Sequence, residues 1–332
     1  MNPDGPGYAV TLTGSDLAPA ESPGPLPVIA EVPEVDGIPV SGLLAAAPGP
    51  RAVVVALHGG AVDSRYFDCP GHPEYSLLRA GQRLGYTVLA LDRPGFGSSA
   101  PHARRLDSPQ RRVDLVYGAV DALLDGLPRG AGVFLLAHSA GCELAVRMAA
   151  AERGADLLGL ELAGTGRRHQ QAAHELLWGT DRIAGRRPRG VGRLIWEPSR
   201  LYPDDVRGGG TVSAQGSHLE SRALHDWAAR EFLGLAPDIC VPVRYSLGEY
   251  ERVWRNDPAE MVAVGGMFTR SPRVVVNRMP DTGHNSSLGR TAPAYHRSVL
   301  AFAEECTNAR GTGDFSGPAL QFDGGAAARP ER

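Results

Sequence analysis

The stretch LLAHSAGCELA, Leu135–Ala145, places a serine between small residues where an apolar run meets a segment of helical character. The pattern around Ser139 is small-x-Ser-x-Gly, with Ala137 at the position where glycine is usual and Gly141 at the last position. Small residues allow a strand to turn sharply into a helix, and a serine at such a turn is exposed as a nucleophile. Alternatively, Ser139 only caps the helix that follows, as serine commonly does. The rest of the sequence bears on this choice.

Strand and helix patterns alternate on both sides of this stretch. Short runs rich in valine and leucine are typical of strands buried on both faces of a sheet. The segments between them repeat apolar residues at three- and four-residue steps, as helices do. The predicted strands are 52–57, 86–92, 132–138, 155–164, 241–251 and 272–279, and the predicted helices are 75–85, 108–127, 140–152 and 292–306. The alternation predicts an α/β fold with a mostly parallel central sheet and helices on both faces.

The alternating pattern also divides the chain into regions. Residues 27–164 and 236–308 carry the pattern and are predicted to form one core. Residues 165–235 interrupt it and are predicted to form an inserted cap or lid, since long irregular segments within compact domains are usually functional. Residues 1–26 and 309–332 are rich in proline or glycine and are predicted to be disordered tails.

Composition excludes several classes of protein. The chain of 332 residues has a net charge of −3, so no overall attraction to nucleic acid or to an anionic membrane is expected. It has no apolar run of roughly 18 residues that would span a bilayer and no N-terminal secretory pattern, so a cytoplasmic location is expected. The cysteines are far apart, and His169 and His174 are poorly spaced for one helical face. We therefore expect free thiols, no metal and no cofactor.

Three further motifs carry polar groups that an acyl-transfer site requires. LHGG (57–60) ends the first long strand, and its glycines permit close backbone approach to an anion, although an ordinary turn would look the same. LGEYE (247–251) ends a later strand and offers Glu249 and Glu251. DTGHNSS (281–287) places His284 in the loop after the last predicted core strand. The chain order is then serine, acid, histidine.

Together with LDRPGFGSS (91–99), these motifs resemble the α/β-hydrolase fold superfamily, over roughly residues 30–305 apart from the insert. The resemblance implies that Ser139 is the nucleophile and His284 the general base. It favours Glu251 as the triad acid, with Glu249 as the alternative. The backbone N–H groups of Gly60 and Ala140 would form the oxyanion hole, with Ala61 as an alternative to Gly60. Asp92 and Arg93 would be structural, and neither His58 nor His138 would be the base.

The resemblance implies a serine hydrolase that cleaves a carboxylic ester, lactone or thioester through an acyl-enzyme. An acyltransferase or cyclase would use the same groups, and a non-catalytic binding module is the third alternative. The expected partner is a small-molecule acyl substrate. The segment from Arg167 to Arg207 contains nine arginines and five acidic residues. Its excess of positive charge would suit an anionic substrate, such as a carrier-protein or CoA thioester. We expect at least one of three tryptophans of the insert, Trp178, Trp196 and Trp227, to affect substrate choice more than stability. Alternatively, these side chains only hold the insert together.

Overall fold

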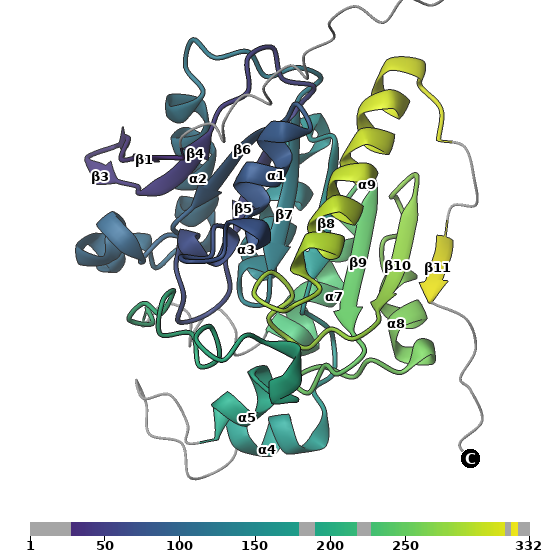
Figure 1. Ribbon diagram of the computed structural model, residues 1–332. Coiled ribbons are helices and arrows are strands. Elements are labelled where there is room, and N and C mark those ends of the chain that lie inside the picture. The colour runs from purple at the N-terminus through teal and green to yellow at the C-terminus, as the bar shows by residue number, and fades with distance from the viewer. Residues whose placement is uncertain (1–27, 179–189, 218–226, 316–319, 325–332) are drawn as a thin grey trace, which may run out of the picture.

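The computed structural model describes residues 28–178, 190–217, 227–315 and 320–324. Its main sheet has nine strands in the order β1-β4-β6-β5-β7-β8-β9-β10-β11 (Figure 1). Strands β4 to β6 and β1 to β4 pair antiparallel, and all the other pairs are parallel. The strands of this sheet are β1 (Ile29–Glu31), β4 (Gly42–Ala45), β5 (Val53–Leu57), β6 (Thr87–Leu91), β7 (Val133–His138), β8 (Gly159–Ala163), β9 (Val243–Gly248), β10 (Val274–Met279) and β11 (Leu320–Gly324). A separate hairpin pairs β2 (Glu34–Val35) with β3 (Ile38–Pro39).

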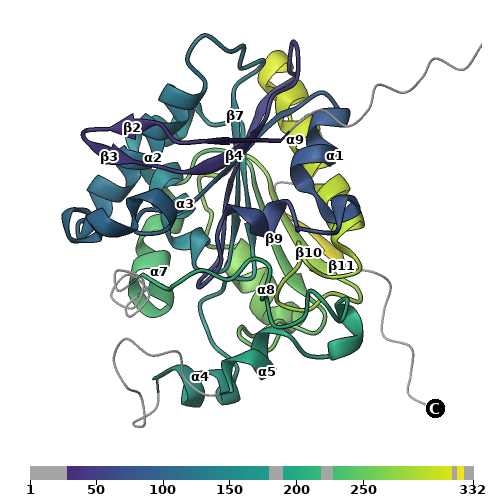
Figure 2. The same cartoon turned by 60° about the vertical axis from the view of Figure 1, so that its left-hand side comes forward.

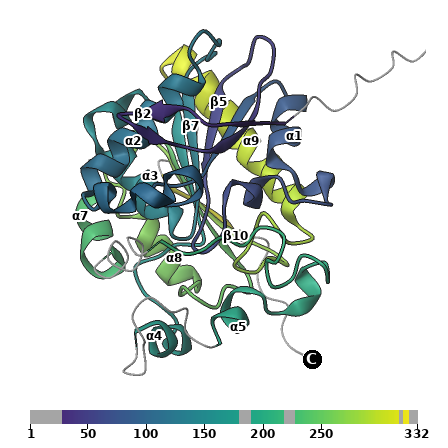
Figure 3. The same ribbon diagram turned by 90° about the vertical axis from the view of Figure 1, so that its left-hand side faces the viewer.

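Helices cover both faces of the sheet. Figures 2 and 3 show α2, α3 and α7 on one side and α1 and α9 on the other. The helices are α1 (Leu77–Arg83), α2 (Pro109–Leu123), α3 (Gly141–Ala150), α4 (Gln171–Trp178), α5 (Val191–Ile195), α7 (Phe232–Leu235), α8 (Pro258–Gly265) and α9 (Ala292–Thr312). The mostly parallel sheet between two helical layers is the predicted fold.

Alternating side chains of each central strand enter two different cores. In β5, Val53, Val55 and Leu57 pack with residues of α2 and α3, whereas Val54 and Ala56 pack with residues of α1 and α9. Every residue of β5 is buried, because helices cover both sides of it. This double burial explains why the strand reads as a continuous apolar run rather than as an alternating one.

The C-terminal end corrects one predicted boundary. The segment predicted as a tail, 309–332, includes the last turn of α9 up to Thr312 and all of β11. β11 pairs in parallel with β10 and extends the sheet beyond the predicted core. Apolar and polar residues alternate in it as in a strand, but the run is short and lies in a glycine-rich segment, and it pairs with the backbone groups at the edge of β10. The predicted N-terminal tail, residues 1–26, lies outside the described residues.

The end of the predicted insert also differs from the sequence boundary at 235. A π-helical turn, Trp227–Glu231, leads directly into α7. Trp227 and Phe232 are fully buried in the same core as α3, with their ring centroids 5.0 Å apart. Because these residues pack in the core with α3, the structure places residues 227–235 with the core rather than with the predicted insert.

The described parts of the insert lie at the end of the sheet that holds the functional loops. In all three views, α4 and α5 lie beyond the carboxyl ends of the central parallel strands (Figures 1, 2 and 3). Ligands of open α/β sheets bind at this edge. No helix among the described residues has both the length and the apolar character needed to cross a bilayer.

Candidate active site

Ser139 lies at a tight turn between β7 and α3. Its backbone φ of 51° is in the left-handed region, which is unfavourable for a serine and therefore has to be stabilised by its surroundings. The Ser139 N–H donates to the carbonyl of Ala163 at 2.8 Å, and the Ser139 carbonyl accepts from Cys142 N–H at 2.9 Å. A Cβ at Gly141 would lie 2.5 Å from the carbonyl oxygen of Leu57, so the glycine lets α3 start against β5.

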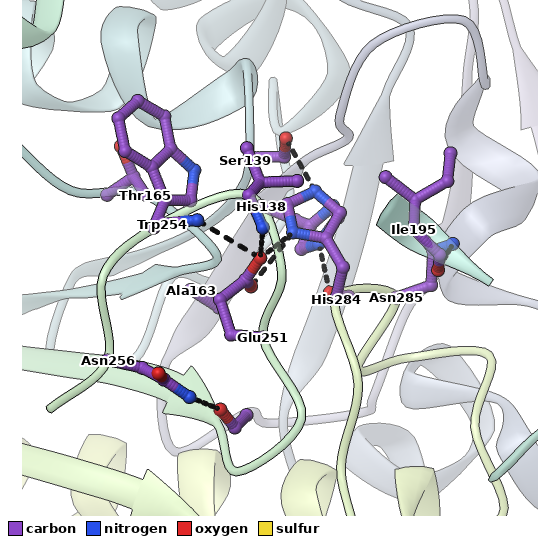
Figure 4. A network of polar contacts seen from close by, with 12 residues as sticks. His138, Ser139, Ala163, Thr165, Ile195, Glu251, Trp254, Asn256, His284 and Asn285 are labelled. Carbon is purple, nitrogen blue, oxygen red and sulfur yellow. Dashed lines mark hydrogen bonds and ion pairs between the residues drawn. The ribbon is translucent and has the colours of Figure 1, made fainter. Parts of the chain in front are cut away.

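The hydroxyl of Ser139 points toward His284 rather than capping α3. Ser139 Oγ lies 3.0 Å from His284 Nε2 (Figure 4). On the other side of the ring, His284 Nδ1 lies 3.0 and 2.9 Å from the two carboxylate oxygens of Glu251. All three groups come from loops at the carboxyl edge of the sheet, and the His284 and Glu251 side chains are buried. The alternative that Ser139 only caps the helix does not fit this hydroxyl geometry.

Backbone donors hold the Glu251 carboxylate, and the insert holds the backbone of the Glu251 loop. Its Oε1 accepts hydrogen bonds from the N–H groups of Val253 at 2.7 Å and Trp254 at 3.4 Å. Gln170, from the insert, donates its amide to the backbone carbonyls of Glu251 and Trp254. The acid loop is therefore fixed by its own backbone and by one insert side chain.

The alternative acid, Glu249, has a different partner. Its carboxylate accepts a hydrogen bond from the backbone N–H of Asp281 at 3.0 Å. Asp281 has a left-handed φ of 47°, so Glu249 stabilises the turn that leads into the histidine loop. The structure brings Glu251, and not Glu249, to the imidazole of His284.

The loop containing the predicted oxyanion donors passes beside Ser139. A Cβ on Gly59 would lie 3.2 Å from the Cβ of Ser139, so the backbone of this loop comes close to the serine. Within the described part of the chain, the N–H groups of Gly60 and Ala140 donate to no protein acceptor. Ala61 follows with a left-handed φ of 55°. The arrangement leaves the two backbone donors available to an anionic oxygen.

Two buried histidines bond the loops of the site but take no part in the contacts that join Ser139, His284 and Glu251. His138 donates from Nε2 to the carbonyl of His284 at 2.8 Å and stacks on Tyr66 with centroids 4.6 Å apart. His58 contacts the carbonyl of Gly59. Burial lowers the pKa of both imidazoles well below 6.5, so both are neutral. The sequence analysis assigned neither as the base.

The insert also forms hydrogen bonds with the other two loops of the site. Ala214 N–H donates to the carbonyl of Ala61 at 3.1 Å, in the loop with the oxyanion donors. The hydroxyl of Tyr202 accepts from the N–H of Asn285 at 3.2 Å. Asn285 Nδ2 donates to the carbonyl of Ile195 at 2.9 Å, and Figure 4 shows these two residues side by side.

The contacts of Gln170 and Tyr202 at the site were not predicted from the sequence. Neither residue lies in a motif, because their partners are backbone groups that only the fold brings close. The indole of Trp178 lies outside the described side chains, whereas Trp196 is buried.

Comparison with known proteins agrees with this architecture. Residues 54–295 match the model of the alpha/beta hydrolase family. Protein ABHD14A of Danio rerio is 42% identical over 74 residues, which are 22% of this chain and 25% of the relative, so the match spans about a quarter of that protein's length.

Solved structures extend the likeness over most of the chain. A membrane phospholipase A has a TM-score of 0.60 at 18% identity, covering 83% of this chain and 87% of the other. The N-acyl homoserine lactonase AidH has a TM-score of 0.58 at 18% identity, covering 85% and 98%. At such identities these structures share the fold. With the family match over most of its length, this chain belongs to the alpha/beta hydrolase family.

Proposed function

We propose that this protein is a serine hydrolase that cleaves a carboxylic ester, lactone or thioester through an acyl-enzyme. The observation that carries the proposal is the continuous contact from Ser139 Oγ through His284 to Glu251. A neutral imidazole that accepts the serine proton at Nε2 and donates from Nδ1 to a carboxylate is arranged for general-base catalysis.

In the proposed first step, His284 removes the hydroxyl proton while Ser139 Oγ attacks the substrate carbonyl carbon. The negative charge that develops on the carbonyl oxygen would be stabilised by the N–H groups of Gly60 and Ala140. Collapse of the tetrahedral intermediate breaks the bond to the leaving alcohol or thiol, which takes the proton from His284. Glu251 orients the imidazole and stabilises its cationic form.

In the proposed second step, water attacks the acyl-enzyme, with His284 again as the base, and the acid product leaves. Capture of the same acyl group by an alcohol or amine would instead make the protein an acyltransferase or cyclase. Product analysis separates these outcomes, because hydrolysis releases a free carboxylic acid. Phospholipase A and the lactonase, which share the fold, are named for acting on ester bonds of different kinds.

A fluorophosphonate probe and a panel of esters, lactones and thioesters test the proposal. The native protein should be labelled on Ser139 and should release acid from at least one class. Ser139→Ala should fold normally, lose the label and lose about 10⁴- to 10⁶-fold in kcat. Ser271→Ala is the matched control, since Ser271 Oγ donates to the carbonyls of Val241 and Arg273 and contacts none of the three residues of the proposed triad. Unchanged turnover in Ser139→Ala would reject the mechanism.

A further inference from the structure

One buried guanidinium contacts both loops that carry the proposed oxyanion donors. Arg93 lies in the turn after β6, and its side chain is buried against the ring of Phe96. Arg93 Nη2 donates to the carbonyl of Gly59 at 2.9 Å, and Nη1 donates to the carbonyl of Ala140 at 3.5 Å. The rigid, planar guanidinium therefore sets the separation between the Gly59 loop and the start of α3.

The first of these bonds determines where the Gly60 N–H points. The carbonyl of Gly59 and the N–H of Gly60 belong to one planar trans peptide, in which the two groups point in opposite directions. Donors that hold the Gly59 carbonyl on one side therefore hold the Gly60 N–H on the other. A hydrogen bond from a cationic group is also stronger than one from a neutral group.

His58 adds a second donor to the same carbonyl. Its Nδ1–H donates to Gly59 O at 2.8 Å, while its Nε2 accepts the backbone N–H of Arg93 at 3.0 Å. Both bonds require the neutral Nδ1–H tautomer. The Gly59 carbonyl thus receives one hydrogen bond from each of two buried side chains.

The peptide held in this way is one that would otherwise rotate easily. Glycines on both sides of it impose little steric restriction on the backbone. A rotated Gly59–Gly60 peptide would present a carbonyl oxygen instead of an N–H donor, and would repel the developing anion. No Cβ fits at Gly59, since it would lie 2.8 Å from His138 Nδ1, so a side chain cannot restrict this backbone instead.

We propose that Arg93 is a positioning residue of the oxyanion hole, which fixes the Gly59–Gly60 peptide with its N–H toward the substrate and ties it to Ala140. The inference rests on the proposed serine-hydrolase function. A positioning role differs from a purely structural one, because loss of the Arg93 side chain should weaken binding of the transition state more than binding of the substrate.

Arg93→Met and Arg93→Lys test the inference on an ester that the native protein turns over. Loss of an oxyanion donor costs about 10²- to 10³-fold in kcat, and a misplaced donor costs less, so Arg93→Met should lose about 10- to 100-fold in kcat with KM within about threefold. Affinity for a boronic acid analogue of the tetrahedral intermediate should fall by a similar factor. Arg93→Lys, which can donate to one carbonyl but not span both, should be intermediate.

Arg112→Met is the matched control. Arg112 is equally buried, pairs with Glu143 at 3.1 Å in the layer of α2 and α3, and does not contact the Gly59 loop. The Arg112→Met variant should be less stable than the native protein and should retain the native kcat. The pH dependence of kcat should keep its midpoint in Arg93→Met, since that substitution leaves the contact between His284 and Glu251 in place.

Several outcomes would overturn the inference. Native kcat in a folded Arg93→Met or Arg93→Lys variant, equal loss of kcat in Arg112→Met, or an effect on KM alone would reject the positioning role while leaving the serine hydrolase intact. If Arg93→Met does not fold, Arg93→Lys decides the question. Absence of both probe labelling and turnover in the native protein would reject the proposed function, and the positioning role with it.

Discussion

At the residue scale, Glu249 and Glu251 are separated by one residue, yet the direction of the backbone gives their carboxylates different partners. Glu251 contacts His284 Nδ1 with both carboxylate oxygens, whereas Glu249 caps the turn at Asp281. Glu251→Gln should lower kcat by about 10³- to 10⁴-fold, because an amide cannot stabilise the imidazolium as a carboxylate does. Glu249→Gln should change kcat by less than about tenfold. Steady-state kinetics of both variants on one ester compare them, and the reverse ranking would assign the acid role to Glu249.

His296 makes unfolding depend on pH. It is buried in α9 with both ring nitrogens unpartnered within the described part of the chain, and burial lowers its pKa to about 3. Below about pH 6.5 the unfolded chain binds a proton that the folded protein excludes, so stability falls with decreasing pH until about pH 3. His296→Leu should therefore reduce the loss of unfolding free energy between pH 7 and pH 5 by about 2 kcal/mol.

Urea denaturation at both pH values measures this effect. Phe302→Leu is the control, because Phe302 is buried on α9 and carries no titratable group, so its replacement should lower stability equally at the two pH values. An identical pH dependence in His296→Leu and the native protein would show that this imidazole does not couple protonation to folding.

Local motifs made some residues of the site predictable. The small residues around Ser139 and the glycines of LHGG reflect turns whose geometry depends on a few neighbouring residues, so they are visible in the sequence. Arg93 was expected to be structural, and its hydrogen bonds to two separate loops are visible only in the folded structure. Gln170 and Tyr202 had no signal at all, since each bonds backbone groups far away in the chain.

At the scale of elements, the close approach of α3 to β5 constrains the position of Ser139. A Cβ at Gly141 would lie 2.5 Å from the Leu57 carbonyl, so Gly141→Ala must push α3 away from β5. Overpacking of this kind costs about 1–3 kcal/mol, and the shift would also move Ser139 and Ala140, which precede α3. We expect a lower melting temperature together with a loss of kcat of at least about tenfold.

A second helical glycine provides the control for this substitution. Gly234 in α7 has open space where a Cβ would be added, so Gly234→Ala should leave stability unchanged or raise it by about 0.4–1 kcal/mol, with native kcat. Thermal denaturation and kinetics of both variants make the comparison. Equal behaviour of the two variants would mean that α3 adapts without disturbing the turn.

Among the elements, the buried parallel strands and the helices α1, α2 and α3 were predicted to within a few residues, because continuous apolar runs and helical periodicity reflect burial directly. The helix α8, which connects β9 to β10, was not predicted. β11 was missed because its alternating apolar and polar residues form only a short run in a glycine-rich segment, and its pairing with β10 is visible only in the structure. Trp227–Leu235 was assigned to the insert for a similar reason. Its apolar residues form one short stretch after the irregular part of the insert, and only packing against α3 reveals them as core.

For the molecule as a whole, the burial of the tryptophan before α7 favours a role in stability over a role in substrate choice for this residue. Trp227 is 1% exposed, and truncation of a buried aromatic side chain costs about 3–5 kcal/mol. Trp227→Ala should therefore lower the melting temperature by several degrees while the acyl preference of the folded enzyme stays native. Trp227→Phe, which retains most of the apolar contact, should lie between. A changed acyl preference at unchanged melting temperature would return Trp227 to the insert.

The hydrogen bonds of the insert to the three loops of the site have a consequence for protein engineering. Gln170, Tyr202 and Ala214 each bond the backbone of a different loop, so the insert does not behave as an exchangeable module. A chimaera in which the insert of another family member replaced this one would keep loops that do not match the new insert. Recombination between relatives should yield active enzymes only when the crossover points lie outside the loops, so that the insert and its three partner peptides are inherited together.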